Sequence, residues 1–206
     1  MKQYPSIGRD NVKGQPFYVF DKLDGSNVRA EWNPKKGFWK FGSRTQLLDL
    51  QSSPLGALAI PLMKAQEDQI GSILRGLRAQ EATCFFEFYG PSSFAGVHQW
   101  KELNFQAVLF DVTLFKRGFM QPGEFVKTFA HKVSIPSLLH YGNVSDVIAQ
   151  KVWDGTLPGM TFEGVVCKGT PLKNGYPPHM FKLKSKAWIE KVKSLYTDPK
   201  KLEELL

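Results

Sequence analysis

The stretch FYVFDKLDGSNVRAEW, residues 17–32, decides how the fold of this chain is predicted. Its first four residues are aromatic or β-branched, a composition typical of a strand. The segment DGSN, residues 24–27, predicts a turn, because glycine tolerates a positive φ angle and Asp, Ser and Asn side chains bond to nearby backbone groups. The alternating residues 28–32 predict a second strand. The sequence therefore predicts a β-hairpin, with Lys22 at the end of its first strand.

Lys22 is the position in this hairpin where chemistry is expected. Apolar side chains flank it and favour partial removal of its amine from water. Desolvation and nearby positive charge lower the pKa of a lysine and expose its lone pair, so we expect a lowered pKa and a nucleophilic amine at Lys22. The alternative is an ordinary solvated lysine beside a turn, because most lysines in proteins are exposed.

The composition fits one folded domain. The chain has 206 residues, of which 42% are hydrophobic and 13% aromatic, enough to build a core. No apolar run approaches the roughly 18 residues of a membrane span, and the N-terminus lacks the apolar core of a signal peptide. Cys84 and Cys167 lie inside apolar runs and are expected to be core thiols, which favours a reducing compartment. We expect one domain over residues 1–206, a cytoplasmic location and no membrane partner.

The charge of the chain is strongly positive. The net charge is +8, and seven lysines lie between Lys182 and Lys201 against only Glu190 and Asp198. A polyanionic partner such as a nucleic acid is the functional interpretation, and a solvated helix face is the alternative. The four histidines are too far apart in the sequence to match the spacing of a zinc site.

Further elements follow from local patterns. Residues 38–41 predict a strand, and residues 61–78 predict an amphipathic helix that packs against a sheet. Shorter helices are predicted at residues 122–130 and 145–151, and a basic helix at residues 187–195, followed by a charged tail. No linker or internal repeat divides the chain.

Two apolar strands carry acidic residues. Residues 83–90 and 106–115 both predict strands buried on two faces. Glu87 lies among four aromatic residues, where a carboxylate is costly unless it binds a partner. An edge position or a structural salt bridge is the alternative. Phe110 precedes Asp111 in the other strand, and most phenylalanines in such strands belong to the core.

Basic residues follow or occupy other strands. Arg44 comes after a strand and a glycine, where a guanidinium can bind a phosphate with two hydrogen bonds, although a surface arginine is the alternative. Lys182 and Lys184 are two residues apart in a predicted strand, so their side chains lie on the same face. Lys168 lies at the end of another predicted strand. Its two interpretations are a contact to a phosphate and an ordinary solvated lysine.

These residues belong to motifs that resemble those of the covalent nucleotidyltransferases, which are DNA ligases, RNA ligases and mRNA capping enzymes. The Ser-Asn pair after the first motif makes the chain similar to the RNA ligase 2 branch, whereas DNA ligases and capping enzymes usually carry Arg where Asn27 stands. The matching residues, in the family's order, are Lys22-x-Asp24-Gly25, Ser43-Arg44, Glu87-Phe88-Tyr89-Gly90, Phe110-Asp111, Glu163-Gly164-Val165-Val166 and Lys182-x-Lys184.

The resemblance implies the catalytic residues. Lys22 is implied as the nucleophile that takes up the nucleotide, and Lys182 and Lys184 as the residues that hold its α-phosphate. Glu163 is implied to bind the metal, and Glu87 to contact the ribose hydroxyls or the metal. Carboxylates suit this role because Mg²⁺ takes oxygen ligands.

The resemblance also implies the remaining nucleotide contacts. Phe110 is expected to stack on adenine, and Val166, or its neighbour Val165, to cover the other face of the base. Further nucleotide contacts are expected at Asp21, Asn27 and Arg44.

The implied fold class is α+β, an ATP-grasp-like nucleotidyltransferase domain with antiparallel sheets flanked by helices. The implied activity is that of an ATP-dependent RNA ligase, which uses ATP and Mg²⁺ (or Mn²⁺) to join 3′-OH and 5′-phosphate ends through lysyl-AMP. DNA ends, a GTP-dependent capping reaction and a non-catalytic nucleic-acid-binding module remain alternatives. Only residues 185–206 follow the last motif, so we expect no separate C-terminal domain. A protein partner could then replace the domain that relatives carry there.

Overall fold

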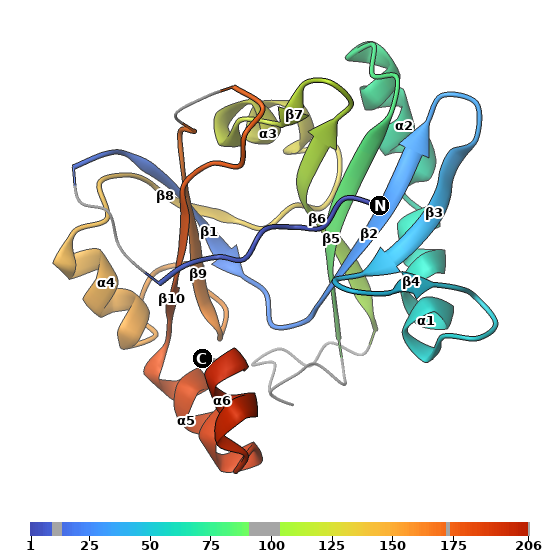
Figure 1. The fold of residues 1–206 in the computed structure, drawn as a ribbon. Coiled ribbons are helices and arrows are strands. Elements are labelled where there is room, and N and C mark those ends of the chain that lie inside the picture. Colours follow the sequence, from blue (N-terminus) through green and yellow to red (C-terminus); the bar gives the residue numbers. More distant parts are fainter. Residues whose placement is uncertain (10–13, 91–103, 172–173, 206) are drawn as a thin grey trace.

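The computed structural model describes residues 1–9, 14–90, 104–171 and 174–205. Within these residues, ten strands form two antiparallel sheets and six helices surround them (Figure 1). The larger sheet has the order β4-β3-β2-β5-β6-β7 and the smaller one the order β10-β9-β1-β8. The predicted α+β class with antiparallel sheets flanked by helices is therefore confirmed.

The strands of the larger sheet are β2 (Ser26–Asn33), β3 (Gly37–Ser43), β4 (Leu47–Leu48), β5 (Ala82–Tyr89), β6 (Gln106–Leu114) and β7 (Gly118–Phe119). Those of the smaller sheet are β1 (Phe17–Lys22), β8 (Leu138–Gly142), β9 (Gly164–Gly169) and β10 (Met180–Lys184). The helices are α1 (Pro54–Lys64), α2 (Glu67–Gly76), α3 (Pro122–Phe129), α4 (Asp146–Trp153), α5 (Lys186–Leu195) and α6 (Pro199–Leu205).

The predicted β-hairpin around Lys22 is wrong. The strands β1 and β2 form as expected, but β1 pairs with β8 and β9, whereas β2 pairs with β3 and β5. The turn between them carries the chain from one sheet to the other. A Cβ atom at Gly25 would lie 2.3 Å from the carbonyl oxygen of Phe88, so this crossing passes close to β5 and requires glycine. Lys22 consequently lies where the two sheets meet.

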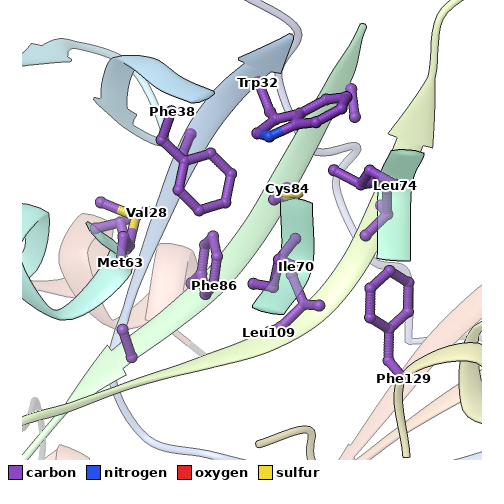
Figure 2. Packing of buried hydrophobic residues seen from close by; sticks show 14 of the residues in the cluster. Val28, Trp32, Phe38, Met63, Ile70, Leu74, Cys84, Phe86, Leu109 and Phe129 are labelled. Atoms are coloured by element: carbon purple, nitrogen blue, oxygen red, sulfur yellow. The ribbon is translucent and has the colours of Figure 1, made fainter. Parts of the chain in front are cut away.

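The main hydrophobic core lies on one face of the larger sheet. Side chains of β2, β5 and β6 pack there against α1, α2 and α3, as Figure 2 shows for Trp32, Phe86, Leu109, Ile70 and Phe129. Alternate residues of β5 point to the opposite face, where Phe85 contacts Tyr4 and Glu87 faces a cleft. Both faces of β5 are thus covered, as its apolar sequence predicted.

The single helix predicted over residues 61–78 is also wrong. The segment holds two helices, because α1 begins at Pro54 with the Ser53 side chain as its cap and ends near Ala65. Gln66 makes the break, since its side-chain amide donates to the carbonyl oxygens of Leu62 and Ala107. Pro61 lies inside α1 rather than at a helix start.

The smaller sheet packs on α4. Its side chains Phe17, Val165, Cys167 and Phe181 are buried in the cluster that they form with Val152 of this helix. The structure adds β8, a strand that the sequence did not predict, as the neighbour of β1. Beyond α5, the predicted charged tail is instead the helix α6, whose leucines pack on a small cluster around Trp188. Cys84 and Cys167 are buried free thiols, as predicted. None of the helices in the described residues has the length and apolar character of a membrane span.

Candidate active site

A cleft of about 650 Å³ lies where the two sheets meet. Strand ends of both sheets line it, because β1, β9 and β10 approach it from one side and β2, β5 and β6 from the other. The residues predicted for the site line this one cleft: Asp21, Lys22, Asn27, Arg44, Glu87, Phe110, Glu163, Val166, Lys182 and Lys184. Val165, the alternative to Val166, is instead buried in the core of the smaller sheet.

Strand register explains why distant residues meet. In the smaller sheet, Lys22 of β1 is opposite Gly164 of β9, which is opposite Lys184 of β10. This row of three neighbouring strands places both lysines beside Glu163, the residue just before β9. In the larger sheet, Asn27 of β2 is opposite Glu87 of β5. Two rows of polar residues therefore face the cleft from its two sides.

Glu163 is the ionic centre of the cleft. One carboxylate oxygen lies 2.8 Å from the Lys22 amine and the other lies 3.1 Å from the Lys184 amine. Glu163 is buried, and the side chains of Lys22 and Lys184 are 22% and 7% exposed. Lys22 is therefore held in place by a carboxylate while its amine keeps some access to the cleft.

The predicted lowering of the Lys22 pKa is wrong for this arrangement. Burial does lower the pKa of Lys22, but the carboxylates of Glu163, Glu87 and Asp24 together outweigh burial and raise it above its ordinary value. Lys22 is therefore protonated at neutral pH, and its amine becomes nucleophilic only after a proton is lost. The sequence pattern around Lys22 did not include these distant carboxylates.

The other two lysines behave in the opposite way. Burial lowers the pKa of Lys182, and the charges of Lys22, Arg9 and Arg44 lower it further. Burial lowers the pKa of Lys184 to about 8, with Glu163 opposing the shift. Three lysines and two arginines thus concentrate positive charge in the cleft, which favours an anionic ligand such as a phosphate chain.

Burial also disfavours the ionised form of two carboxylates of the cleft, Glu87 and Asp21. Burial raises the pKa of Glu87 to about 8, opposed by Lys22 and assisted by Glu163 and Asp24. Burial raises the pKa of Asp21 to about 6, although Asp21 accepts a hydrogen bond of 2.9 Å from the Thr161 backbone amide. A bound cation would relieve the charge repulsion around Glu87 and Glu163.

In metal-free buffer, Glu87→Gln is expected to reduce the pH dependence of stability. Because folding raises the pKa of Glu87 from 4.5 to about 8, this group contributes stability that is present below about pH 4 and is lost as the pH rises through 8. The wild-type protein should therefore lose more unfolding free energy between about pH 5 and pH 8.5 than the Glu87→Gln variant does. Urea unfolding at several pH values measures this, and equal losses in both proteins would contradict the burial of the charge.

Aromatic and aliphatic side chains form a second region of the cleft. Phe110 lies edge-on to Tyr4, with ring centroids 4.9 Å apart, and Val166 projects from β9. Beneath them, the Lys168 amine donates to Asp111 at 2.9 Å and to the Phe110 carbonyl oxygen at 2.8 Å. Lys168 is 5% exposed, so the alternative of a solvated lysine at that position is wrong. This region is suited to a flat, apolar ligand group such as a nucleobase.

The sequence did not reveal the part played by the N-terminal segment. Tyr4 donates to Asp111 at 2.8 Å, and Arg44 donates to the Ser6 hydroxyl at 3.0 Å. Gly8 pairs with Phe181 of β10, so the segment runs from the larger sheet to the smaller one and forms a wall of the cleft (Figure 1). Its sequence, MKQYPSIGR, has no strand or helix periodicity that would have predicted this position.

Two observations bear on ligand binding. The side-chain oxygen of Asn27 is buried in the cleft wall and has no hydrogen-bond partner among the described residues. In the same described part of the chain, no group of three or more His, Cys, Asp or Glu residues could hold a metal ion by itself. Glu163 and Glu87 are the carboxylates of the cleft that would be offered to a Mg²⁺ ion, which takes one or two carboxylates together with substrate phosphates and water.

No protein-family model and no curated protein matches this sequence. Among solved structures, a mutant of Naegleria gruberi RNA ligase with ATP and Mn matches with a TM-score of 0.65 and 19% identity, over 94% of this chain and 58% of that one. An apo mutant of the same ligase matches with a TM-score of 0.61 and 20% identity, over 93% and 60%.

The same ligase with PPi gives a TM-score of 0.61 and 20% identity, over 88% of this chain and 53% of that chain. This chain thus spans somewhat more than half the length of the ligase that it matches. At this level of identity the similarity concerns the fold. The chain has the fold of the part of Naegleria gruberi RNA ligase that it matches.

Proposed function

We propose that this chain is an ATP-dependent RNA ligase domain that forms lysyl-AMP at Lys22 and joins 5′-phosphate and 3′-OH ends. The observation that carries this proposal is the position of Lys22 at 2.8 Å from Glu163, in a cleft that is lined by several cations and by an aromatic region. Such a cleft suits a nucleotide whose phosphates lie beside the lysines. The fold shared with Naegleria gruberi RNA ligase supports the same reaction class.

The first step forms a bond between the Lys22 nitrogen and the α-phosphorus of ATP. The bond from that phosphorus to the bridging oxygen breaks, pyrophosphate leaves, and the amine loses its protons to solvent. Negative charge develops on the phosphorus oxygens in the transition state, and Lys182 and Lys184 are positioned to stabilise it. Fixed cations in a partly dehydrated cleft are effective because they need no reorganisation during the reaction.

Proton loss from Lys22 is the step that the protein must promote. The carboxylates of Glu163, Glu87 and Asp24 hold the pKa of Lys22 above its ordinary value while they are ionised and unpaired with a cation. When bound, Mg²⁺ or Mn²⁺ supplies positive charge that neutralises Glu163 and Glu87 and also screens the phosphates. With that positive charge present, the carboxylates would favour the protonated form of Lys22 less, which would ease the loss of its proton.

The later steps use a nucleic acid. AMP moves from Lys22 to a 5′-phosphate, and a 3′-hydroxyl attacks that phosphate and releases AMP. The net charge of +8 and the exposed lysines of α5 and α6, which include Lys186, Lys193 and Lys200, favour a polyanionic partner. RNA is the proposed substrate, with DNA ends as the alternative, and a partner protein is proposed to assist end binding.

Labelled nucleotides test the choice of substrate. The chain should take up label from ATP that carries it on the α-phosphate, and it should take up little from GTP labelled in the same way. Preferential labelling by GTP would favour a capping-type guanylyltransferase, and no labelling by either nucleotide in Mg²⁺ or Mn²⁺ would favour a non-catalytic binding module. Pre-adenylylated RNA and DNA strands, supplied with matching 3′-OH acceptors, then separate RNA joining from DNA joining without the first step.

A further inference from the structure

Lys184 is held on several sides, and one of its contacts is an aromatic ring. Its amine lies 3.1 Å from a carboxylate oxygen of Glu163 and donates to the carbonyl oxygen of Leu205. The same amine lies 3.6 Å from the centre of the Trp188 ring, the shortest of the cation–ring distances among the described residues. An ammonium over an indole face is attracted by the negative face of the ring, most strongly where water is excluded.

The local sequence places Trp188 in this position. Ser185 directly follows β10 and caps α5. Its hydroxyl accepts a hydrogen bond from the Trp188 amide at 3.1 Å and donates one to the Phe162 carbonyl oxygen at 2.6 Å. Its own amide donates to the Glu163 carbonyl oxygen at 2.9 Å. The cap therefore fixes the first turn of α5 against the segment that carries Glu163. Trp188 lies four residues after Lys184, and this turn brings its ring back under the amine.

Trp188 belongs to a small hydrophobic cluster, but it also contacts the cleft. Its ring packs with Phe162 and Val192 and is 2% exposed. Its indole nitrogen is buried without a hydrogen-bond partner among the described residues. A buried indole N–H usually has a hydrogen-bond partner. If packing were the only role of this side chain, an aromatic ring without an N–H group would suit the position better. Contact with the amine of Lys184 is what the indole face provides here.

We infer that Trp188 is a positioning residue for Lys184. The face of the Trp188 ring holds the ammonium group of Lys184 against the nucleotide phosphates. This inference rests on the proposed function, since it concerns the formation of lysyl-AMP. Trp188 acts through Lys184 and makes no chemical step itself. Its ring limits the positions that the flexible lysine side chain can take, so the charge is already in place when the phosphorus is attacked.

A double-mutant cycle tests this role. Trp188→Leu should slow lysyl-AMP formation at saturating ATP by about tenfold, because the ring face is lost. Trp188→Phe keeps a ring face and should retain most of the rate. In a Lys184→Ala background, Trp188→Leu should cause little further loss, since the residue through which it acts is already gone. Val192→Ala is the matched control, because it removes packing from the same cluster and should leave the rate unchanged.

A second measurement does not depend on activity. The ε-methylene protons of Lys184 should be shifted upfield in the NMR spectrum by the ring current of Trp188. Trp188→Leu should abolish this shift and Trp188→Phe should keep part of it. A wild-type chain that forms no lysyl-AMP would overturn the proposed function, while the upfield shift would still support the contact between the two side chains.

Three results would overturn the inference itself. One is an equal rate loss from Trp188→Leu with and without Lys184. Another is a rate loss in Val192→Ala as large as that in Trp188→Leu. The third is an ordinary chemical shift for the Lys184 ε-methylene group in the wild-type protein.

Discussion

Lys22→Ala is expected to form no AMP adduct under any condition in which the wild-type chain forms one. The amine of Lys22 is the proposed nucleophile, and a change of this kind lowers the rate by a factor on the order of 10⁴ or more. Intact-mass spectrometry after incubation with ATP and Mg²⁺ measures it. The fold should persist, because Glu163 keeps its ion pair with Lys184 at 3.1 Å.

Lys22→Arg is the matched control for that experiment. An arginine can keep the ion pair with Glu163, but its guanidinium stays protonated and cannot attack phosphorus. The Lys22→Arg variant should therefore be as inactive as the Lys22→Ala variant while it unfolds at nearly the wild-type urea concentration. An adduct that persists in either variant would show that another residue carries the nucleotide.

Glu163→Gln is expected to have the second largest effect, and this effect should appear in both activity and stability. Glutamine has the same shape, but it leaves Lys22, Lys182 and Lys184 near one another without the carboxylate between them. Removing one partner from a buried ion pair costs about 3–5 kcal/mol of unfolding free energy. Lysyl-AMP formation should fall on the order of a thousandfold, because metal binding and the placement of both lysines are lost.

Glu190→Gln provides the control for Glu163→Gln. Glu190 also lies near a lysine, Lys186, but its carboxylate oxygen is 3.8 Å from the Lys186 amine and both side chains are exposed. Surface pairs of this kind contribute only about 0–1 kcal/mol, so the urea midpoint and the rate should hardly change. If Glu163→Gln and Glu190→Gln behaved alike, the central ionic role assigned to Glu163 would be wrong.

Much of the candidate site could be predicted because its residues occur in short motifs on strands. Alternation and aromatic composition placed Lys22, Glu87 and Phe110 on strands that the structure contains. The sequence order of the motifs then indicated one common site, and the strand register brings their residues to one cleft. These local signals need no knowledge of which strands are neighbours.

The errors come from interactions between distant parts of the chain. Turn chemistry at Asp24 and Gly25 predicted a turn there, but it could not show that β1 and β2 enter different sheets. The pKa of Lys22 depends on Glu163, which is 141 residues away in sequence. Local composition contains no information on that charge. The break at Gln66 likewise depends on a hydrogen bond to the carbonyl oxygen of Ala107 in β6.

The most direct test of the central claim is the intact mass of the wild-type chain after incubation with ATP and Mg²⁺, followed by peptide mapping. The account predicts a mass increase of one AMP per chain, on the peptide that contains Lys22, and loss of that increase on addition of pyrophosphate. An unmodified chain in both Mg²⁺ and Mn²⁺, or an AMP group mapped to a peptide without Lys22, would contradict it.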